Sequence, residues 1–293
     1  MENKLAIFNK KKRNAELTII FCVIGTALGI VVFFSSYLDS NVFLLVLGIV
    51  LGLGSFIGSA VGFAAYRNTA NKFKVEVLAE MFKELIPGTE YKPKFGLTQE
   101  VVYSTKFLKR ADRFYSEDFL QGKLGDVEFI SSDVKLEEKH VERTEQGTRT
   151  YYTTYFLGRI FRFDFNKEFV GGLQVHEKGH PVVRGYKKVK LESIDFNKKF
   201  KTFTNEEITA FYILTPDIME AIFNLEKRNP GLITLSFHGN FLYVAINNKK
   251  DTFEVKMFRK IDETVVQKFQ EELLVIKDFI ITLKLNNKLF KKA

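Results

Sequence analysis

A chain of 293 residues with 46% hydrophobic content is long enough for one sizeable core plus a membrane anchor, or for two modest domains. The formal net charge is +9. Residues 1–66 hold five basic and three acidic side chains, a net charge of +2, so the remaining residues carry a net charge of +7. That surplus is mild for its length and argues against a nucleic-acid partner. The only cysteine is Cys22, which excludes an intrachain disulfide framework.

Two charge-free stretches follow a short basic start. Residues 17–37 form a stretch of 21 residues, residues 42–66 form one of 25, and four residues separate them. A helix of about 20 apolar residues crosses a hydrocarbon core of about 30 Å. We therefore predict a transmembrane helical hairpin over 17–66, with a basic cytoplasmic N-terminus over 1–16. A cleaved signal peptide is disfavoured because a second span follows at once.

The distribution of Lys and Arg predicts the orientation of this hairpin. Five basic residues precede the first span, none lies in the loop between the spans, and three more, Arg67, Lys72 and Lys74, follow the second. Basic residues accumulate on the cytoplasmic side of membrane proteins. We expect a two-span protein of the cell membrane, in contact with the lipid bilayer and with both termini in the cytoplasm.

Small residues recur at four-residue steps in both spans, at Gly25 and Gly29 in the first and at Gly48, Gly52, Gly54, Gly58 and Gly62 in the second. Such spacing lets helix backbones approach closely. The glycines favour packing of the hairpin on itself over assembly with other membrane chains.

Beyond the spans, residues 67–112 are expected to form a helical stalk or connector. Apolar residues at four-residue steps predict a helix over 70–86 that Pro87 and Gly88 would end. A shorter helix is predicted over 98–108.

Residues 113–260 are predicted to form a soluble α+β domain. Aromatic and β-branched residues alternate with polar ones in segments such as EDFLQGKLGDVEF and TYYTTYFLGRIFRFDF. The short connections leave no room for crossover helices, so a mainly antiparallel sheet is expected. Flanking helices are predicted after a capping box at Thr204 and Glu207, and over 215–227, where a Thr-Pro pair opens the segment.

Two shorter patterns predict turns within this domain. The segments LITLSF and FLYVAI flank residues 238–240, which read His-Gly-Asn and predict a β-hairpin. Residues 164–169 read DFNKEF and residues 195–200 read DFNKKF, but the surrounding sequences differ, so a true repeat is not predicted. In both segments we expect a strand that leaves the sheet into a turn.

Residues 261–293 are predicted to form one long amphipathic helix and a basic tail. Apolar residues recur at steps of three and four, at Val266, Phe269, Leu273, Ile276, Ile280 and Leu283. With fewer than four heptads, packing across the sheet is favoured over a coiled-coil contact with a partner. The tail residues Lys284, Lys288, Lys291 and Lys292 could contact anionic lipid.

One segment matches a catalytic pattern. Residues His176, Glu177 and His180 spell the metalloprotease motif H-E-x-x-H, in which a helix places both histidines on one face to bind zinc, with the glutamate as general base. Here Gly179 lies inside the motif, Pro181 follows it and strand-like residues precede it. We therefore favour a polar loop after a strand, and predict no catalytic, cofactor-binding or metal-binding residues.

Five sequence blocks occur in order: EDFLQGKLGDVEF, FLGRIFRFDFNKEFVGG, VKLESIDFNKKF, AFYILTPDIMEAI and LSFHGNFLYVAI. Together with Asp251, Phe253 and Glu254 they make the chain, from roughly Phe114 to Phe258, resemble the bacterial family of domain of unknown function 3137. The resemblance implies an integral membrane protein without an assigned reaction. It also suggests a LemA-type membrane protein as partner.

The fold class predicted is α+β: a two-helix transmembrane hairpin, then a soluble domain with a mainly antiparallel sheet, flanking helices and a long C-terminal amphipathic helix. The functional hypothesis is a membrane-anchored cytoplasmic binding or scaffold domain without a cofactor. The alternatives are a membrane-surface hydrolase that uses the His176, Glu177 and His180 loop with a metal, and a domain that senses lipid or a small ligand.

Overall fold

The computed structural model describes residues 2–38, 41–144, 147–283 and 285. The chain divides into two compact units. The anchor unit comprises Met1–Leu78 and Val255–Gln267, and the sheet unit comprises Ala79–Glu254 and Lys268–Ala293. The basic tail that was predicted to contact lipid lies outside the described residues.

Long apolar helices make up most of the anchor unit. Helix α1 (Glu2–Leu38) and helix α2 (Val42–Phe73) form the two arms, and a π-helical turn, η1 (Lys74–Leu78), follows. Within the described ranges, two helices are long and apolar enough to cross a membrane, and the bent pair α6 and α7 passes the same test only when its two parts are joined. Only 6% of the most apolar window of each long helix is buried. The predicted pair of candidate membrane helices is confirmed.

The glycines of α1 and α2 lie where the two helices approach. A Cβ atom on Gly29 would lie 2.5 Å from the Gly52 nitrogen, and one on Gly48 would lie 2.6 Å from the Phe33 nitrogen. By contrast, a Cβ on Gly54 would meet open space. Packing of the hairpin on itself, the favoured prediction, accounts for most of these glycines.

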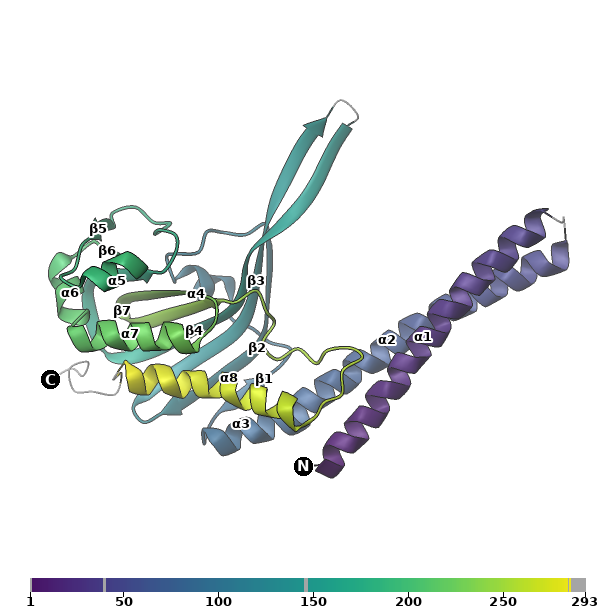
Figure 1. Ribbon diagram of the computed structural model, residues 1–293, viewed down its shortest axis with the longest axis horizontal. Coiled ribbons are helices and arrows are strands. Elements are labelled where there is room, and N and C mark those ends of the chain that lie inside the picture. The colour runs from purple at the N-terminus through teal and green to yellow at the C-terminus, as the bar shows by residue number, and fades with distance from the viewer. Residues whose placement is uncertain (1, 39–40, 145–146, 284, 286–293) are drawn as a thin grey trace. The chain divides into compact units, whose positions relative to one another are not determined.

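Antiparallel strands form the sheet of the sheet unit, in the order β1-β2-β3-β4-β6-β5, with β7 also pairing to β4 (Figure 1). Seven strands lie among the described residues: β1 (Glu90–Lys92), β2 (Arg113–Leu124), β3 (Val127–Thr144), β4 (Gly147–His176), β5 (Lys187–Val189), β6 (Lys201–Thr204) and β7 (Leu232–Asn247). The predicted mainly antiparallel sheet is confirmed.

The hairpin predicted around residues 238–240 is wrong. Strand β7 runs without a turn from Leu232 to Asn247, and Gly239 sits within it at a φ of +57°. Both halves of β7 pair with β4, and the register shifts near Gly239. The extra residues at this shift lie in β4, where Asp164 and Phe169 pair with Phe241 and Gly239, so β4 carries the bulge and the His-Gly-Asn segment continues as a strand rather than forming a turn.

Helices cover the sheet: α3 (Ala79–Leu85), α4 (Gln99–Tyr103), α5 (Ile194–Lys199), α6 (Glu207–Ile213), α7 (Pro216–Arg228) and α8 (Glu263–Thr282), whose first turn belongs to the anchor unit. Thr215 caps α7 through the Ile218 N–H, as the Thr-Pro pair predicted. The capping box at Thr204 is wrong, because α6 begins after Glu206 and Thr204 Oγ accepts the Glu206 N–H instead. The strand and turn predicted for residues 195–200 are also wrong, because this second DFNK segment lies in helix α5.

Apolar side chains are buried on both faces of the sheet. On one face, Phe279 of α8 packs against Phe161 and Phe163 of β4, with ring centroids 5.5 and 5.9 Å apart. On the other, Val134 and Ile160 join a cluster covered by the segment around α4. An ion pair of 3.2 Å between Arg228 and Asp278 links α7 to α8, which lie side by side in Figure 1. The predicted packing of the C-terminal stripe is confirmed, because its six apolar residues are all buried.

The outer parts of β3 and β4 extend beyond the sheet as a two-stranded arm (Figure 1). From about residue 139 to residue 153, the described side chains of the arm are exposed or half-buried. Among the described residues, neither strand of the arm has a second neighbour there.

Candidate functional site

A groove of about 640 Å³ opens in the sheet unit between the segment after β1, strands β2 and β3, and the loop after β7. Its wall is partly apolar and partly charged. The apolar lining residues are Leu97, Phe114, Tyr115, Val134 and Leu157, and the charged ones are Lys94, Glu117, Asp133, Lys135 and Asp251. Apolar walls with a few converging polar groups are typical of small-ligand sites.

A bulge in β2 shapes one end of this groove. The register between β2 and β3 shifts after Glu117, and Asp118 adopts a φ of +57°. The Asp118 N–H donates to the Pro93 carbonyl at 3.1 Å, which ties the bulge to the segment after β1. The bulge turns the Asp118 side chain into the interior, where it is fully buried.

The segment after β1 approaches β2 closely. A Cβ atom on Gly96 would lie 2.3 Å from the carbonyl carbon of Ser116, so only glycine fits at this position. The next residue, Leu97, donates its N–H to Ser132 Oγ at 2.8 Å. Close packing here brings Lys94 and Leu97 to the edge of the groove.

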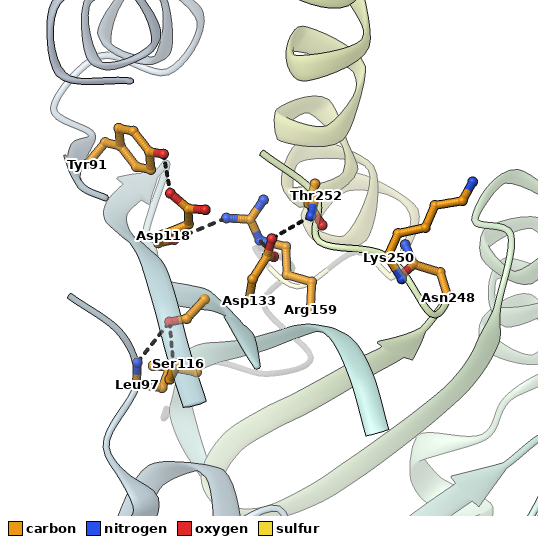
Figure 2. Close-up of polar contacts among 10 residues, drawn as sticks. Tyr91, Leu97, Ser116, Asp118, Asp133, Arg159, Asn248, Lys250 and Thr252 are labelled. Carbon is orange, nitrogen blue, oxygen red and sulfur yellow. Dashed lines mark hydrogen bonds and ion pairs between the residues drawn. The ribbon is translucent and has the colours of Figure 1, made fainter. Parts of the chain in front are cut away.

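Figure 2 shows a buried polar network beneath the groove, formed by side chains from β1, β2, β3 and β4 and by the loop after β7. The Tyr91 hydroxyl donates to Asp118 Oδ1. Arg159 lies between two acidic residues: its Nη2 is 3.4 Å from the Asp118 carbonyl oxygen and its Nε is 3.7 Å from Asp133 Oδ1. Asp133 Oδ2 in turn accepts the Thr252 N–H at 2.6 Å.

Arg159 is a buried cation with few hydrogen bonds. Its side chain is 3% exposed, and its guanidinium carbon lies 4.3 Å from the centre of the Phe253 ring. Among the described residues, neither Nε nor Nη1 donates a hydrogen bond within the normal distance. The ring face and the nearby carboxylate therefore provide much of the compensation for its burial.

Asp133 connects the network to the groove. It lines the groove, yet only 4% of the residue is exposed. Burial raises the pKa of Asp133 to about 7, helped by the nearby charges of Asp118 and Asp251 and opposed by Arg159 and the Thr252 N–H. A carboxyl group that titrates near neutral pH at the wall of a groove is a feature of functional sites.

Three carboxylates could hold a cation at the same end of the groove. One oxygen atom each from Glu117, Asp118 and Asp251 lies within 4.8 Å of the others. Glu117 is exposed, Asp118 is buried and Asp251 is half-buried. Hard divalent cations prefer such oxygen ligands, although acidic clusters on proteins are common without a bound ion.

The H-E-x-x-H segment is not on a helix. His176 ends β4, and the residues after it, with Gly179 at a φ of +106°, form a turn. His176 is buried between the rings of Phe107 and Phe203, and burial lowers its pKa to about 4. Because the strand-and-turn backbone differs from the helix that the zinc motif needs, the segment has the form of a loop after a strand.

Glu177 of this loop already has structural partners. Its Oε2 accepts the Ile233 N–H at 3.1 Å, and its Oε1 lies 3.0 Å from Lys199 Nζ. His180 is exposed. In the part of the chain that the structure describes, these three residues do not form a group that could hold a metal ion.

Reading the sequence alone missed Asp133 and Arg159. They face each other directly across β3 and β4. A usable signal was present, because Arg159 interrupts an apolar strand segment and Asp133 follows two serines where the strand pattern requires buried residues. The pairing itself depends on strand register, which no local pattern reveals.

Comparison with known proteins gives one family and one solved structure. Residues 154–285 match the family described as "Protein of unknown function (DUF3137)". No curated protein matches the chain. The crystal structure of the mycobacterial trehalose monomycolate transport factor A, TtfA, is similar over 74% of this chain and 97% of that chain, with 7% sequence identity and a TM-score of 0.41.

Proposed function

We propose that this chain, which belongs to the DUF3137 family over residues 154–285, is a membrane-anchored binding protein whose sheet unit takes up a small ligand with a cationic group. The groove in the sheet unit is the binding site. The observation that carries the proposal is the convergence of carboxylates from three segments, Glu117 on β2, Asp133 on β3 and Asp251 in the loop after β7, on one groove.

The chemistry of the groove suits an amine with an apolar part. The carboxylates of the groove can accept charge-assisted hydrogen bonds from an ammonium or guanidinium group. Leu97, Phe114 and Val134 supply apolar contact along the wall. Lys94 and Lys135 stand on the same wall and select against a ligand with a second cationic group beside them.

Binding rather than reaction is proposed because the lining lacks a recognisable nucleophile with a base. Among the described residues, the groove is lined by neither histidine nor cysteine. Its aliphatic hydroxyl group belongs to Ser116, which donates to Ser132 Oγ at 3.3 Å. Activated nucleophiles instead stand beside a general base.

Thermal unfolding of the detergent-solubilised full chain in the presence of small amines tests the proposal. The probes are ethanolamine and choline, which carry one cationic group, and putrescine and spermidine, which carry more than one and should bind more weakly because of Lys94 and Lys135. Each is compared with acetate at the same ionic strength. A bound amine stabilises the folded state. Glu117→Gln should weaken binding about 10- to 100-fold through loss of a charge-assisted hydrogen bond. Asp195→Asn, which removes an exposed carboxylate on α5, is the matched control.

No stabilisation by any amine, or equal losses in Glu117→Gln and Asp195→Asn, would reject the groove as an amine site. A shift with Mg²⁺ or Ca²⁺ but none with an amine would replace the ligand class by a divalent cation.

The proposal includes both termini in the cytoplasm and a LemA-type protein as membrane partner. Lys and Arg at both ends of the hairpin, and none between its arms, support the orientation. A reporter that works only in the cytoplasm should be active when it is fused after Ala293. A reporter that works only outside the cytoplasm should be inactive at the same position. Co-purification from solubilised membranes tests the partner, and recovery of the chain alone would count against it.

A further inference from the structure

A second groove, of about 870 Å³, lies in the anchor unit between α1 and the chain segment just before α8. We propose that it binds the headgroup of an anionic phospholipid from the surrounding membrane. This groove is separate from the proposed amine-binding groove of the sheet unit. It lies in the anchor unit, is lined by other segments of the chain and has a more basic lining.

Residues far apart in sequence build the groove. Asn9 holds Ile261 by two hydrogen bonds, from the Ile261 N–H to Oδ1 at 2.8 Å and from Nδ2 to the Ile261 carbonyl at 2.7 Å. Lys12 Nζ donates to the Arg259 carbonyl at 2.8 Å. Glu16 Oε1 accepts the Phe258 N–H at 2.8 Å. The segment from Phe258 to Ile261 is thus held against one face of α1.

We call these contacts between α1 and the segment from Phe258 to Ile261 the clamp. The two buried charges within the clamp compensate each other. Lys12 and Glu16 form an ion pair on successive turns of α1, and both are buried. Among the described lining residues, Glu16 is the acidic one, and it is used in that pair and in the hydrogen bond to Phe258. The remaining charge of the groove is therefore positive.

Four exposed basic side chains supply that positive charge. They are Lys10, Arg13, Arg259 and Lys260. In the ranges that the structure describes, none of them forms an ion pair with a carboxylate. Clustered basic residues at a membrane surface attract anionic lipid headgroups, and arginine can bind a phosphate through two parallel hydrogen bonds.

The apolar end of the groove coincides with the start of the first candidate span. Leu17 is the first residue of the charge-free stretch, and Leu17 and Ile20 both line the groove. Phe258, which lines the groove from the clamped segment, is 63% exposed. A groove that changes from basic to apolar along α1 fits an amphiphile whose phosphate meets the basic residues and whose chain follows the span.

Native mass spectrometry of the full chain in neutral detergent tests the proposal with phosphatidylglycerol and phosphatidylcholine as probes. The wild-type chain should retain phosphatidylglycerol in preference to phosphatidylcholine. Arg259→Gln combined with Lys260→Gln should weaken phosphatidylglycerol binding roughly 30-fold, equivalent to about 1 kcal/mol for each basic residue. These changes leave the clamped backbone groups in place.

The matched control removes two neighbouring exposed lysines of β5, as Lys187→Gln combined with Lys188→Gln, and should leave binding unchanged. Equal losses in the two double variants would overturn the proposal, because the attraction would then belong to the whole surface. Equal retention of the two lipids would also overturn it. Displacement of phosphatidylglycerol by millimolar inorganic phosphate would assign the groove to a soluble anion instead.

Discussion

Asp133→Asn tests whether burial or the ion pair with Arg159 controls the network beneath the groove. Asparagine has nearly the same shape as the protonated acid and can still accept the Thr252 N–H. The pKa of Asp133 is raised on folding from 3.8 to about 7. The folded state therefore binds the proton more tightly than the unfolded chain, and the stability due to this proton is lost as pH rises from about 4 to about 7.

The size of this effect follows from the pKa difference. About three pH units, at about 1.4 kcal/mol each, amount to about 4 kcal/mol of unfolding free energy. The asparagine side chain of the variant does not ionise, so the variant should gain stability relative to the wild type by up to this amount between about pH 4 and about pH 8. The buried His176 has a pKa lowered to about 4 and contributes the opposite slope in both proteins, so it cancels in the difference.

The measurement is urea unfolding of the detergent-solubilised chain at about pH 4.5, 6 and 8, which spans the titration of Asp133. Tyrosine fluorescence reports on the transition, because the chain has 11 tyrosines and no tryptophan. Asp195→Asn, at an exposed site, should show no such trend. A stability difference between Asp133→Asn and wild type that is constant with pH would refute the reasoning, since it would mean that Asp133 stays ionised throughout and that attraction to Arg159 outweighs burial.

Three further predictions concern other parts of the molecule. Gly29→Leu should force α1 away from Gly52 and lower the melting temperature of the solubilised chain, whereas Gly54→Leu, which enters open space, should leave it unchanged. Asn9→Ala should remove both hydrogen bonds to Ile261, at a cost of about 1–3 kcal/mol, and speed amide hydrogen exchange at Ile261 relative to wild type; unchanged exchange would show that the clamp does not depend on Asn9. In the two-stranded arm, amides of residues 139–144 should exchange faster than those of 127–136 in the same strand, because a two-stranded ribbon exposed to water is only marginally stable; equal protection would indicate that a partner covers the arm.

Elements with strong local signals could be predicted from the sequence. The charge-free stretches predicted the two long helices, and the stripe from Val266 to Leu283 predicted α8 and its buried face. Both depend on composition and periodicity within one segment. Tertiary context decided the other cases. The same four residues, Asp-Phe-Asn-Lys, lie in strand β4 at 164–167 and in helix α5 at 195–198.

The two sites could not be predicted for a related reason. Asp133 faces Arg159 only in the correct register of β3 and β4, and Glu117 and Asp251 reach the same groove from segments more than 130 residues apart. In the anchor unit, Asn9 and Glu16 are ordinary polar residues of a helix until the segment from Phe258 to Ile261 lies beside them. Long-range contacts of this kind leave no periodic pattern in either segment.

The clamp between α1 and the segment before α8 also sets an order of events during synthesis. Asn9 and Ile261 are 252 residues apart, and ribosomes add about 5–20 residues per second, so on the order of 10 to 50 s separate the synthesis of the two partners. During that interval Lys12 and Glu16 lack their backbone partners at Arg259 and Phe258. In the proposed membrane topology, insertion of the hairpin therefore precedes completion of its basic end, and a chain cut short before Phe258 would lack the second half of the proposed lipid groove.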